Sequence, residues 1–404
     1  MRISTAEIAA QAIQTIDSQS AALQQTQNQL ATGVAVQNAA DNPVAAAQIV
    51  QLEQQQTQLT QYGVNLQSAQ TRLTLEESSL STATNTLQSI RDLAVQGGNA
   101  TLNDANRAQI ATQIQQQIQS LLGTANTKDS NGEYLFAGYA TQTQPFTVDA
   151  AGNVDYEGDA GTRLIQISAN QSVADSDTGA TAFMDIPAGN GTFTTAAAAG
   201  NTGSGSIDTG SVVDSAQWVP DQYTLSFTSA NTYQITDNTT GQTIVANGSY
   251  TSGSAIQFQG VEVTVSGAPA AGDSFSIAPS GNQSMFATLS QLTTALNQPA
   301  DTPAAQAQLA TAIGSALTNI DQGISHLSTV SASVGARLNM LSSQTTTNTS
   351  ASTALASQQS SLQDVDYASA VTTLSQQMVG LQAAEQSYAA ISQLSLFHYL
   401  TSLG

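Results

Sequence analysis

Residues 52–90 read LEQQQTQLTQYGVNLQSAQTRLTLEESSLSTATNTLQSI, with a leucine at every seventh position. Four of these leucines are followed, three positions later, by a residue suited to the same face: Tyr62, Ala69, Ala83 and Ile90. This alternating spacing predicts one apolar face of a long α-helix. The Asp-Asn-Pro run at 41–43 provides cap and first-turn residues, and the glycine pair at 97–98 provides an end. We therefore expect a single helix over residues 44–96, whose apolar face needs a partner.

Three further helices are expected inside the chain. The first begins at Asn103 or Asp104 and carries an isoleucine at every fourth position, so it should fold back on the long helix. The other two cover residues 285–296 and residues 304 to beyond 343, with prolines between them. Helices before the middle of the chain therefore have matching helices after it.

Both ends of the chain carry additional apolar seams at coiled-coil spacing. The N-terminal seam consists of Ile13, Ile16, Leu23, Leu30 and Val34. The C-terminal seam consists of Val371, Leu374, Met378, Leu381, Tyr388, Ile391, Leu394, Leu396 and Phe397. A helix gains most of its stability by packing such a face, so these ends should pack on each other, on other copies of the chain, or on both. An amphipathic helix usually packs into its own domain, but the internal helices already pair with one another, which favours assembly.

Residues 141–280 have a different character, being rich in Gly, Thr, Ser and Asn with short alternating runs typical of strands. The expected strands are Arg163–Ser168, Tyr223–Thr228, Thr232–Thr236, Ile256–Phe258, Val261–Val265 and Ser274–Ile277. The region holds 13 acidic residues and one base, a local charge of −12, which is over half of the total of −21. This charge favours a β-rich insert that faces solvent. Its low-complexity segment, residues 189–210, is expected to form a flexible loop.

The expected fold class is therefore α+β, with long antiparallel helical rod or coiled-coil terminal regions and an inserted β-rich domain. We expect three domains. Residues 1–40 and 350–404 form a terminal helical assembly domain that is disordered in the free monomer. Residues 41–140 and 284–349 form a helical rod, and residues 141–283 form the β-rich insert.

Composition excludes several classes of partner and location. The chain has 404 residues, 28 Asp plus Glu against 7 Lys plus Arg, so nucleic acid and anionic membrane are poor partners. There is no cysteine, which removes disulfides and thiolate chemistry. The opening residues lack the apolar core and cleavage site of a signal peptide, and no stretch approaches the roughly 18 to 20 apolar residues of a membrane span. We expect a soluble protein, or one exported by another route.

The sequence offers little to catalysis, so we expect no enzyme, no cofactor and no metal. His326 and His398 lie on separate helical stretches, where a surface or hydrogen-bonded histidine is the simpler interpretation. The run Asp175–Gly179 resembles part of a calcium loop but lacks its final Glu, so a solvated loop is expected. Asp364 and Asp366 are two positions apart, which indicates a capping or solvated turn.

Several local motifs resemble the flagellin-type family of bacterial flagellar proteins, and most closely its hook–filament junction members. They are residues 1–5 (MRIST), 29–33 (QLATG), 40–43 (ADNP), 134–138 (YLFAG), 334–339 (VGARLN) and 391–396 (ISQLSL). This sequence departs from the family pattern at Ala31 and Asn42. The stretch YLFAG is the most specific element for the junction proteins. The resemblance covers residues 1–140 and 284–404, whereas the insert is similar only in style.

This resemblance implies a structural adaptor that joins a second, hook-side junction protein to the flagellin filament as a ring of subunits. It further implies an extracellular location in the flagellum, type III export without a cleaved signal peptide, and contacts with other copies of itself, flagellin and an export chaperone. Two alternatives stay open. One is the flagellin filament subunit itself, and the other is a secreted binding or adhesive protein whose acidic β domain holds a ligand.

Overall fold

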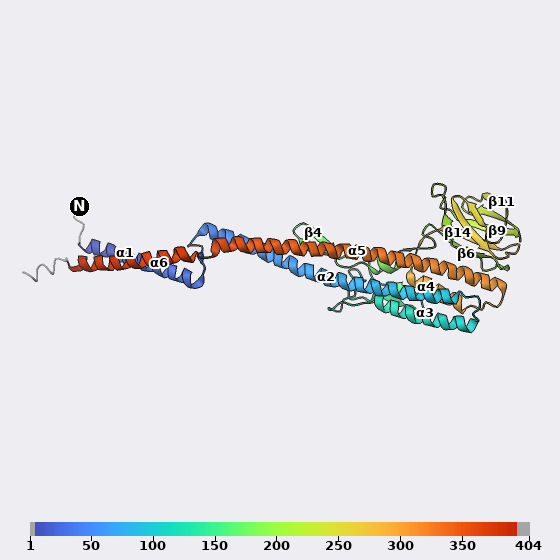
Figure 1. The fold of residues 1–404 in the computed structure, drawn as a ribbon, viewed down its shortest axis with the longest axis horizontal. Helices are drawn as coiled ribbons and strands as arrows, with labels where there is room; N and C mark the ends of the chain where they lie inside the picture. Colours follow the sequence, from blue (N-terminus) through green and yellow to red (C-terminus); the bar gives the residue numbers. More distant parts are fainter. Residues whose placement is uncertain (1–4, 394–404) are drawn as a thin grey trace, which may run out of the picture. The chain divides into compact units, whose positions relative to one another are not determined.

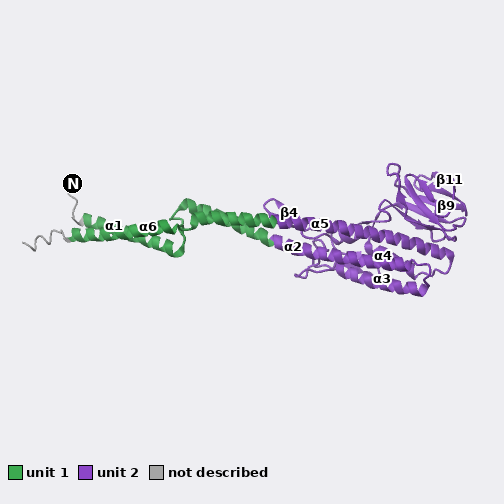
Figure 2. Cartoon of the chain, viewed as in Figure 1, with its two compact units in different colours: residues 1–64, 344–404 green, residues 65–343 purple. Residues whose placement is uncertain are grey.

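The computed structural model describes residues 5–393 and confirms an α+β fold with long helices on either side of a β-rich region (Figure 1). Contacts divide the chain into two compact units (Figure 2). Unit 1 comprises Met1–Val64 and Gln344–Gly404, and unit 2 comprises Asn65–Ser343. The three-domain division expected from the sequence stays a proposal.

In unit 1, helix α1 (Thr5–Thr32) and helix α6 (Tyr367–Gln393) lie side by side (Figure 1). Gly33 ends α1 in the left-handed conformation, with φ +74°. The connections next to both helices then pair with each other: the Ala35 N–H donates to the Gln363 carbonyl at 2.6 Å, and the Val365 N–H donates to the Gly33 carbonyl at 2.9 Å. These backbone bonds hold the C-terminal end of α1 next to the N-terminal end of α6.

The two longest helices follow the predicted seams. Helix α2 covers Pro43–Gly97 and helix α5 covers Pro303–Gln363, and each contributes residues to both units. Asn42 caps α2 as expected, since its side chain accepts a hydrogen bond from the Ala45 N–H at 3.1 Å. The periodic leucines of α2 from position 66 onward are buried, between 0 and 2% exposed.

In unit 2, helices α3 (Asp104–Ala125) and α4 (Met285–Asn297) join α2 and α5 in one hydrophobic core. Asn103 and Ser284 cap their N-termini through side-chain oxygens. The predicted helices in this region are therefore confirmed, and α3 returns alongside α2 as expected (Figure 1).

The first part of the β-rich region belongs to this same core. It contains β1 (Phe146–Val148) paired with β2 (Val154–Tyr156), β3 (Leu164–Ser168) paired with β4 (Gln171–Ala174), a π-helix η1 (Ala180–Met184), and β5 (Ile186–Pro187) paired with β15 (Asn282–Gln283). Phe146 packs on Phe183 and on Phe286 of α4, with ring centroids 5.7 Å and 5.3 Å apart. These aromatic contacts attach the short hairpins to the helices.

The second part forms an antiparallel β domain with its own core. Its strands are β6 (Phe193–Ala197), β7 (Ser206–Ile207), β8 (Ser211–Val212), β9 (Tyr223–Ser229), β10 (Thr232–Asp237), β11 (Thr243–Ser249), β12 (Ala255–Phe258), β13 (Val261–Ser266) and β14 (Ser274–Pro279). One sheet has the order β11-β10-β9-β14-β6, and the other has the order β12-β13-β7, with β8 also paired to β13. All six strands expected from the sequence are present.

The expectation of a flexible loop over residues 189–210 is wrong, because this segment holds β6 and β7. Its Gly- and Ala-rich turn is fixed from a distance by Asp273, which is 2% exposed. The Asp273 carboxylate accepts hydrogen bonds from the backbone N–H groups of Thr202 and Gly203 at 2.8 and 3.0 Å. Order in this segment therefore comes from a partner 70 residues away, which local composition does not reveal.

Candidate assembly surfaces

The two terminal seams contact each other only in part. Ile16, Leu23 and Leu30 on α1 are half-buried, whereas Ile13 is 44% exposed. On α6, Leu374, Leu381, Tyr388 and Ile391 are half-buried. Val371 and Met378 are 52% and 49% exposed. Leu394, Leu396 and Phe397 lie outside the described residues.

Val34 differs from its expected place on the seam. The Gly33 conformation ends α1 before it, and Val34 instead forms an isolated antiparallel bridge with Asp364. It therefore contributes to the connection between the helices rather than to the helical face.

The α1–α6 pair has almost no core of its own. Among the side chains that the structure describes in these two helices, those that are buried are Thr26 and Ala370, one polar and one small. The amide oxygens of Gln19 and Gln377 are also buried without a hydrogen-bond partner. A helix pair that buries no large apolar side chain gains little from its own packing.

The same unit exposes many large apolar side chains. Those that are exposed are Ile8, Ile13, Val44, Val50, Val64, Tyr367, Val371, Met378 and Val379. Scattered apolar residues are normal on a protein surface, but six of these side chains lie on α1 and α6, the two helices that lack a core: Ile8, Ile13, Tyr367, Val371, Met378 and Val379. We take the outward faces of α1 and α6 as the candidate assembly surface.

Two aspartates, Asp41 and Asp366, accept hydrogen bonds from the backbone in the connections between the helices of unit 1. The Asp41 carboxylate accepts from the backbone N–H groups of Gln37 and Asn38 and from the Gln25 side chain at 2.8 to 3.0 Å. Asp366 accepts from the N–H of Ala368 at 3.0 Å and so caps α6, which confirms the capping turn expected there.

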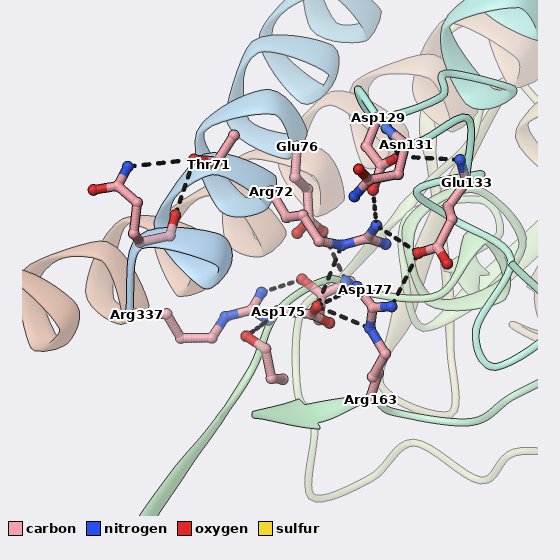
Figure 3. Close-up of polar contacts among 12 residues, drawn as sticks. Thr71, Arg72, Glu76, Asp129, Asn131, Glu133, Arg163, Asp175, Asp177 and Arg337 are labelled. Carbon is pink, nitrogen blue, oxygen red and sulfur yellow. Dashed lines mark hydrogen bonds and ion pairs between the residues drawn. The ribbon is translucent and has the colours of Figure 1, made fainter. Parts of the chain in front are cut away.

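A buried ion network lies within unit 2 (Figure 3). Arg72 of α2 pairs with Asp129 and, at 3.3 Å, with Asp175, which is fully buried. Arg163 pairs with the same Asp175, its Nε donating at 2.8 Å, and with Glu133 at 3.1 Å. Three loop or hairpin segments are thereby fastened to one turn of α2.

A second branch of the network reaches α5. Arg337 pairs with Asp177, and the Asp177 N–H donates to Oε1 of Glu76 at 2.9 Å. Asp175 and Asp177 thus lie against arginines, and the solvated loop expected at 175–179 is wrong. Three of the seven basic residues of the chain are engaged here, so the network is a major use of its scarce positive charge.

Burial and charge perturb two carboxyl groups of the network. Burial of Glu76, together with the nearby charge of Asp177, raises the pKa of its carboxyl to about 8, although Arg337 partly opposes the shift. Burial also disfavours ionisation of Asp129, but hydrogen bonds from the backbone N–H groups of Glu133 and Asn131 and the Arg72 charge outweigh it, and its pKa is lowered. Glu76 therefore holds a proton at neutral pH while Asp129 is ionised.

The stretch at 134–138 is part of the core. Leu135, Phe136 and Ala137 are fully buried, and the Phe136 carbonyl accepts from the Gly179 N–H at 2.8 Å. Gly138 has φ +68°, and a Cβ there would lie 2.2 Å from a carboxylate oxygen of Asp159. Only glycine fits this position.

Other candidate chemistry is absent from the part of the chain described. His326 donates one hydrogen bond from its Nε2–H to the Thr181 carbonyl at 2.6 Å, in agreement with the expected hydrogen-bonded histidine, and His398 lies outside the described residues. No group of three or more His, Asp or Glu side chains between residues 5 and 393 is placed to hold a metal ion. Within the same range no helix has the length and apolarity to cross a membrane.

Sequence comparisons agree with this architecture. Residues 3–141 match the bacterial flagellin N-terminal helical region, and residues 317–400 match the bacterial flagellin C-terminal helical region. Residues 196–279 match the D2-like domain of flagellar hook-associated protein 1. Helical ends of flagellin type around a β domain of hook-associated type define a flagellin-like flagellar protein.

Solved structures narrow the class further. The crystal structure of flagellar hook-associated protein 3 from Legionella pneumophila is 35% identical, with a TM-score of 0.74, over 78% of this chain and 98% of that one. FlgL from Xanthomonas campestris is 32% identical, with a TM-score of 0.72, over 76% and 99% of the two chains. The chain therefore belongs to the FlgL, or flagellar hook-associated protein 3, family.

Two curated proteins, both named flagellar hook-associated protein 3, match this chain over a shorter length. Flagellar hook-associated protein 3 of Escherichia coli strain K12 is 38% identical over 186 residues, which are 46% of this chain and 58% of that protein. The Salmonella typhimurium protein of the same name is 37% identical over the same extent. The match thus spans little more than half the length of these relatives.

Sequence reasoning missed the ion network, although a signal for it exists. Arg72 directly precedes a seam leucine in a helix whose other surface positions are mostly Gln, Ser and Thr, and Arg337 directly precedes the seam residue Leu338 of α5. A lone charge beside an apolar seam in a charge-poor chain suggests a buried partner. The partner itself could not be identified, because Asp175 and Asp177 are about 100 residues from α2.

Proposed function

We propose that this protein is a structural adaptor of the bacterial flagellum, which joins a hook-side junction protein to the flagellin filament as a ring of subunits. Its partners are other copies of itself, the second junction protein, flagellin and a flagellar export chaperone. It works outside the cell after type III export, and it has no catalytic role.

The observation that carries this proposal is the missing core of the α1–α6 pair. These helices bury Thr26 and Ala370 but no large apolar side chain among those described, while Ile13, Val371 and Met378 remain about half exposed. Apolar area of this kind stabilises a helix only once it is removed from water. Neighbouring subunits packed around the pair would supply the contacts that the monomer lacks.

The test places one charge on this surface. Val371→Asp on α6 should leave the secreted protein folded, because the side chain is 52% exposed, but should abolish its incorporation between hook and filament. Val213→Asp is the matched control, since Val213 is also 52% exposed but belongs to the β domain. Both variants are expressed in a strain that lacks its own copy, and motility and filament attachment are scored.

Equal motility of the two variants would refute the proposal, provided that both are secreted in equal amount. Deletion of residues 1–34 or 365–404 gives a second test, since either truncation should leave a folded protein that cannot join filaments. Electron microscopy of the secreted full chain separates an adaptor from a filament subunit, because a filament subunit would form long filaments by itself.

A further inference from the structure

A cavity of about 450 Å³ lies between the β domain and the helices of unit 2. One wall is the strand β6, of which the four residues Thr194, Thr195, Ala196 and Ala197 all line the space. The opposite wall consists of side chains from α4 and α5. Ala196 and Gln291 on its lining are exposed, so solvent reaches it. Its volume is in the range of ligand-binding pockets.

Strand β6 is the last strand of its sheet and turns an unpaired edge toward this space. It pairs only with β14 among the described strands, and Figure 1 shows it on the side of the sheet nearest α5. The Ala198 N–H donates to the Ser274 carbonyl, so the alternation of an antiparallel pair directs residues 194 and 196 toward β14. The backbone N–H and C=O groups of Thr195 and Ala197 then point the other way.

The structure closes this edge at one end only. Phe193 has the same outward orientation, but its N–H donates to Oδ1 of Asn190 at 2.9 Å and its carbonyl accepts from the Asn190 N–H at 3.1 Å. No described residue gives the backbone of Thr195 or Ala197 such a partner. Unpaired edges of this kind accept an added strand, and native proteins usually cover them.

A further donor on the lining lacks a partner. The side-chain Nε2 of Gln283 is buried and makes no hydrogen bond. By contrast, the contacts that attach the β domain to α5 are already made: the Gly189 N–H donates to Asn319 Oδ1 at 2.7 Å, and the Gln308 Nε2 donates to the Ala199 carbonyl at 3.1 Å. The open groups are therefore additional to those that hold the two parts together.

The lining also restricts the chemistry of an occupant. All 18 residues around the cavity are uncharged and none is aromatic; they are Ala, Gly, Thr, Ser, Asn, Gln and one Leu. A charged side chain would be desolvated here without a counter-ion, and a bulky one would meet the α5 face. The four residues of β6 that line the cavity, at about 3.3 Å each, give an edge long enough for an added strand of about four residues.

We propose that this cavity binds an extended segment of another polypeptide, with small uncharged side chains, which adds as a strand to the open edge of β6. Thr195 and Ala197 supply backbone donors and acceptors two residues apart, which is the repeat of an extended strand.

The test uses two synthetic peptides and the full chain. The first is acetyl-Ala-Thr-Ala-Thr-amide, and the second is the same peptide with N-methyl groups on alternate backbone nitrogens. Amide chemical shifts of Thr195 and Ala197 and the side-chain amide of Gln283 are followed by TROSY spectra. The first peptide should shift these signals with saturation in the millimolar range, and N-methylation should weaken the effect at least tenfold, because it removes the donors needed for pairing.

Four results would overturn the proposal. Absence of shifts would indicate a cavity that holds water alone, and equal shifts from both peptides would exclude strand pairing. Shifts that appear with rising protein concentration, without peptide, would indicate a second copy of the chain as the occupant. A cavity-filling variant, Ala312→Phe on α5, should abolish the peptide shifts while the other signals of the β domain keep their positions; unchanged binding by this variant would also place the peptide elsewhere.

Discussion

Replacing Glu76 by Gln should remove most of the pH dependence of folding between about pH 5 and pH 8. The Glu76 carboxyl is fully buried on α2, its Oε1 accepts the Asp177 N–H at 2.9 Å, and its Oε2 has no hydrogen-bond partner. Burial and the Asp177 charge raise its pKa from 4.5 to about 8. Gln keeps the acceptor, replaces the proton by an N–H donor, and cannot ionise.

The sign and size of the effect follow from this pKa. The unfolded chain loses the proton near pH 4.5, whereas the folded chain keeps it until about pH 8. The contribution of Glu76 to stability is therefore fully present below pH 4.5 and is lost as the pH rises to about 8. At about 1.4 kcal/mol for each tenfold change, the loss is on the order of 5 kcal/mol. The Asp129 and Asp237 carboxyls, whose pKa values are lowered, change stability only at more acidic pH.

The assay is guanidinium unfolding, followed by circular dichroism, of the full chain at intervals from pH 5 to pH 8.5. Wild type and Glu76→Gln should have similar midpoints at pH 5, and the variant should be more stable by several kcal/mol at pH 8.5. Glu53→Gln, an exposed change on the same helix, is the control and should follow the wild type throughout. Parallel curves for wild type and Glu76→Gln, or a variant that is less stable at every pH, would refute a protonated Glu76.

Two further substitutions test the core and the ion network. Gly138→Ala should destabilise the protein by about 2 to 4 kcal/mol, because the new methyl group meets the Asp159 carboxylate. Gly132→Ala is the control: Gly132 also has a positive φ, but the space around it is open, so this change should cost about 1 kcal/mol. Thermal unfolding compares the two variants, and equal losses of stability would contradict the steric argument. Arg337→Met leaves Asp177 without its cation and should lower the free energy of unfolding by about 2 to 4 kcal/mol. Arg91→Met, at an exposed ion pair, is the control and should leave the denaturation midpoint unchanged. An unchanged stability of Arg337→Met would show that the network does not anchor the loop that contains Asp177.

The helices could be predicted because their stabilising contacts repeat along the sequence. The heptad leucines of α2 mark the buried face directly, and Leu73, Leu80 and Leu87 are all 0% exposed. Caps could be predicted for the same reason, since the side chains of Asn42 and Asn103 each accept a hydrogen bond from the N–H three residues later. Strands such as β9 and β13 alternate buried and partly exposed residues, and that pattern is also local.

Attachment of the first hairpins to the helices could not be predicted, because its residues share no local pattern. Phe146, Phe183 and Phe286 meet from three separate segments, and Asp175 meets Arg72 across about 100 residues. The number of acidic residues predicts a solvated, charged insert, but Asp175, Asp237 and Asp273 are buried, and each accepts hydrogen bonds or pairs with arginine. Charge count alone cannot separate an acid that faces water from one that orders a turn.

The candidate assembly surface could be predicted as an apolar seam but not as an outward face. Leu374 and Leu381 are half-buried, whereas Met378, between them on the same seam, is 49% exposed. Periodicity gives the stripe on a helix, and only the position of the partner helix decides which part of it stays in contact with water. Val34 shows a second limit, because the positive φ of Gly33 ends the helix just before it.

The distribution of charge connects the two units to the proposed function. Helices α1 and α6 hold three acidic residues, Glu7, Asp17 and Glu385, and no basic residue, while the other surface positions are mainly Gln, Ser, Thr and Ala. Copies of such a helix pair can pack side by side with few ions to desolvate, so modest apolar contacts suffice to stabilise the contact. The ion network, which needs exact partners, lies instead in unit 2, where the chain supplies both signs of charge itself. This distribution supports the proposal that neighbouring subunits stabilise α1 and α6, whereas the ions of unit 2 find their partners within the chain.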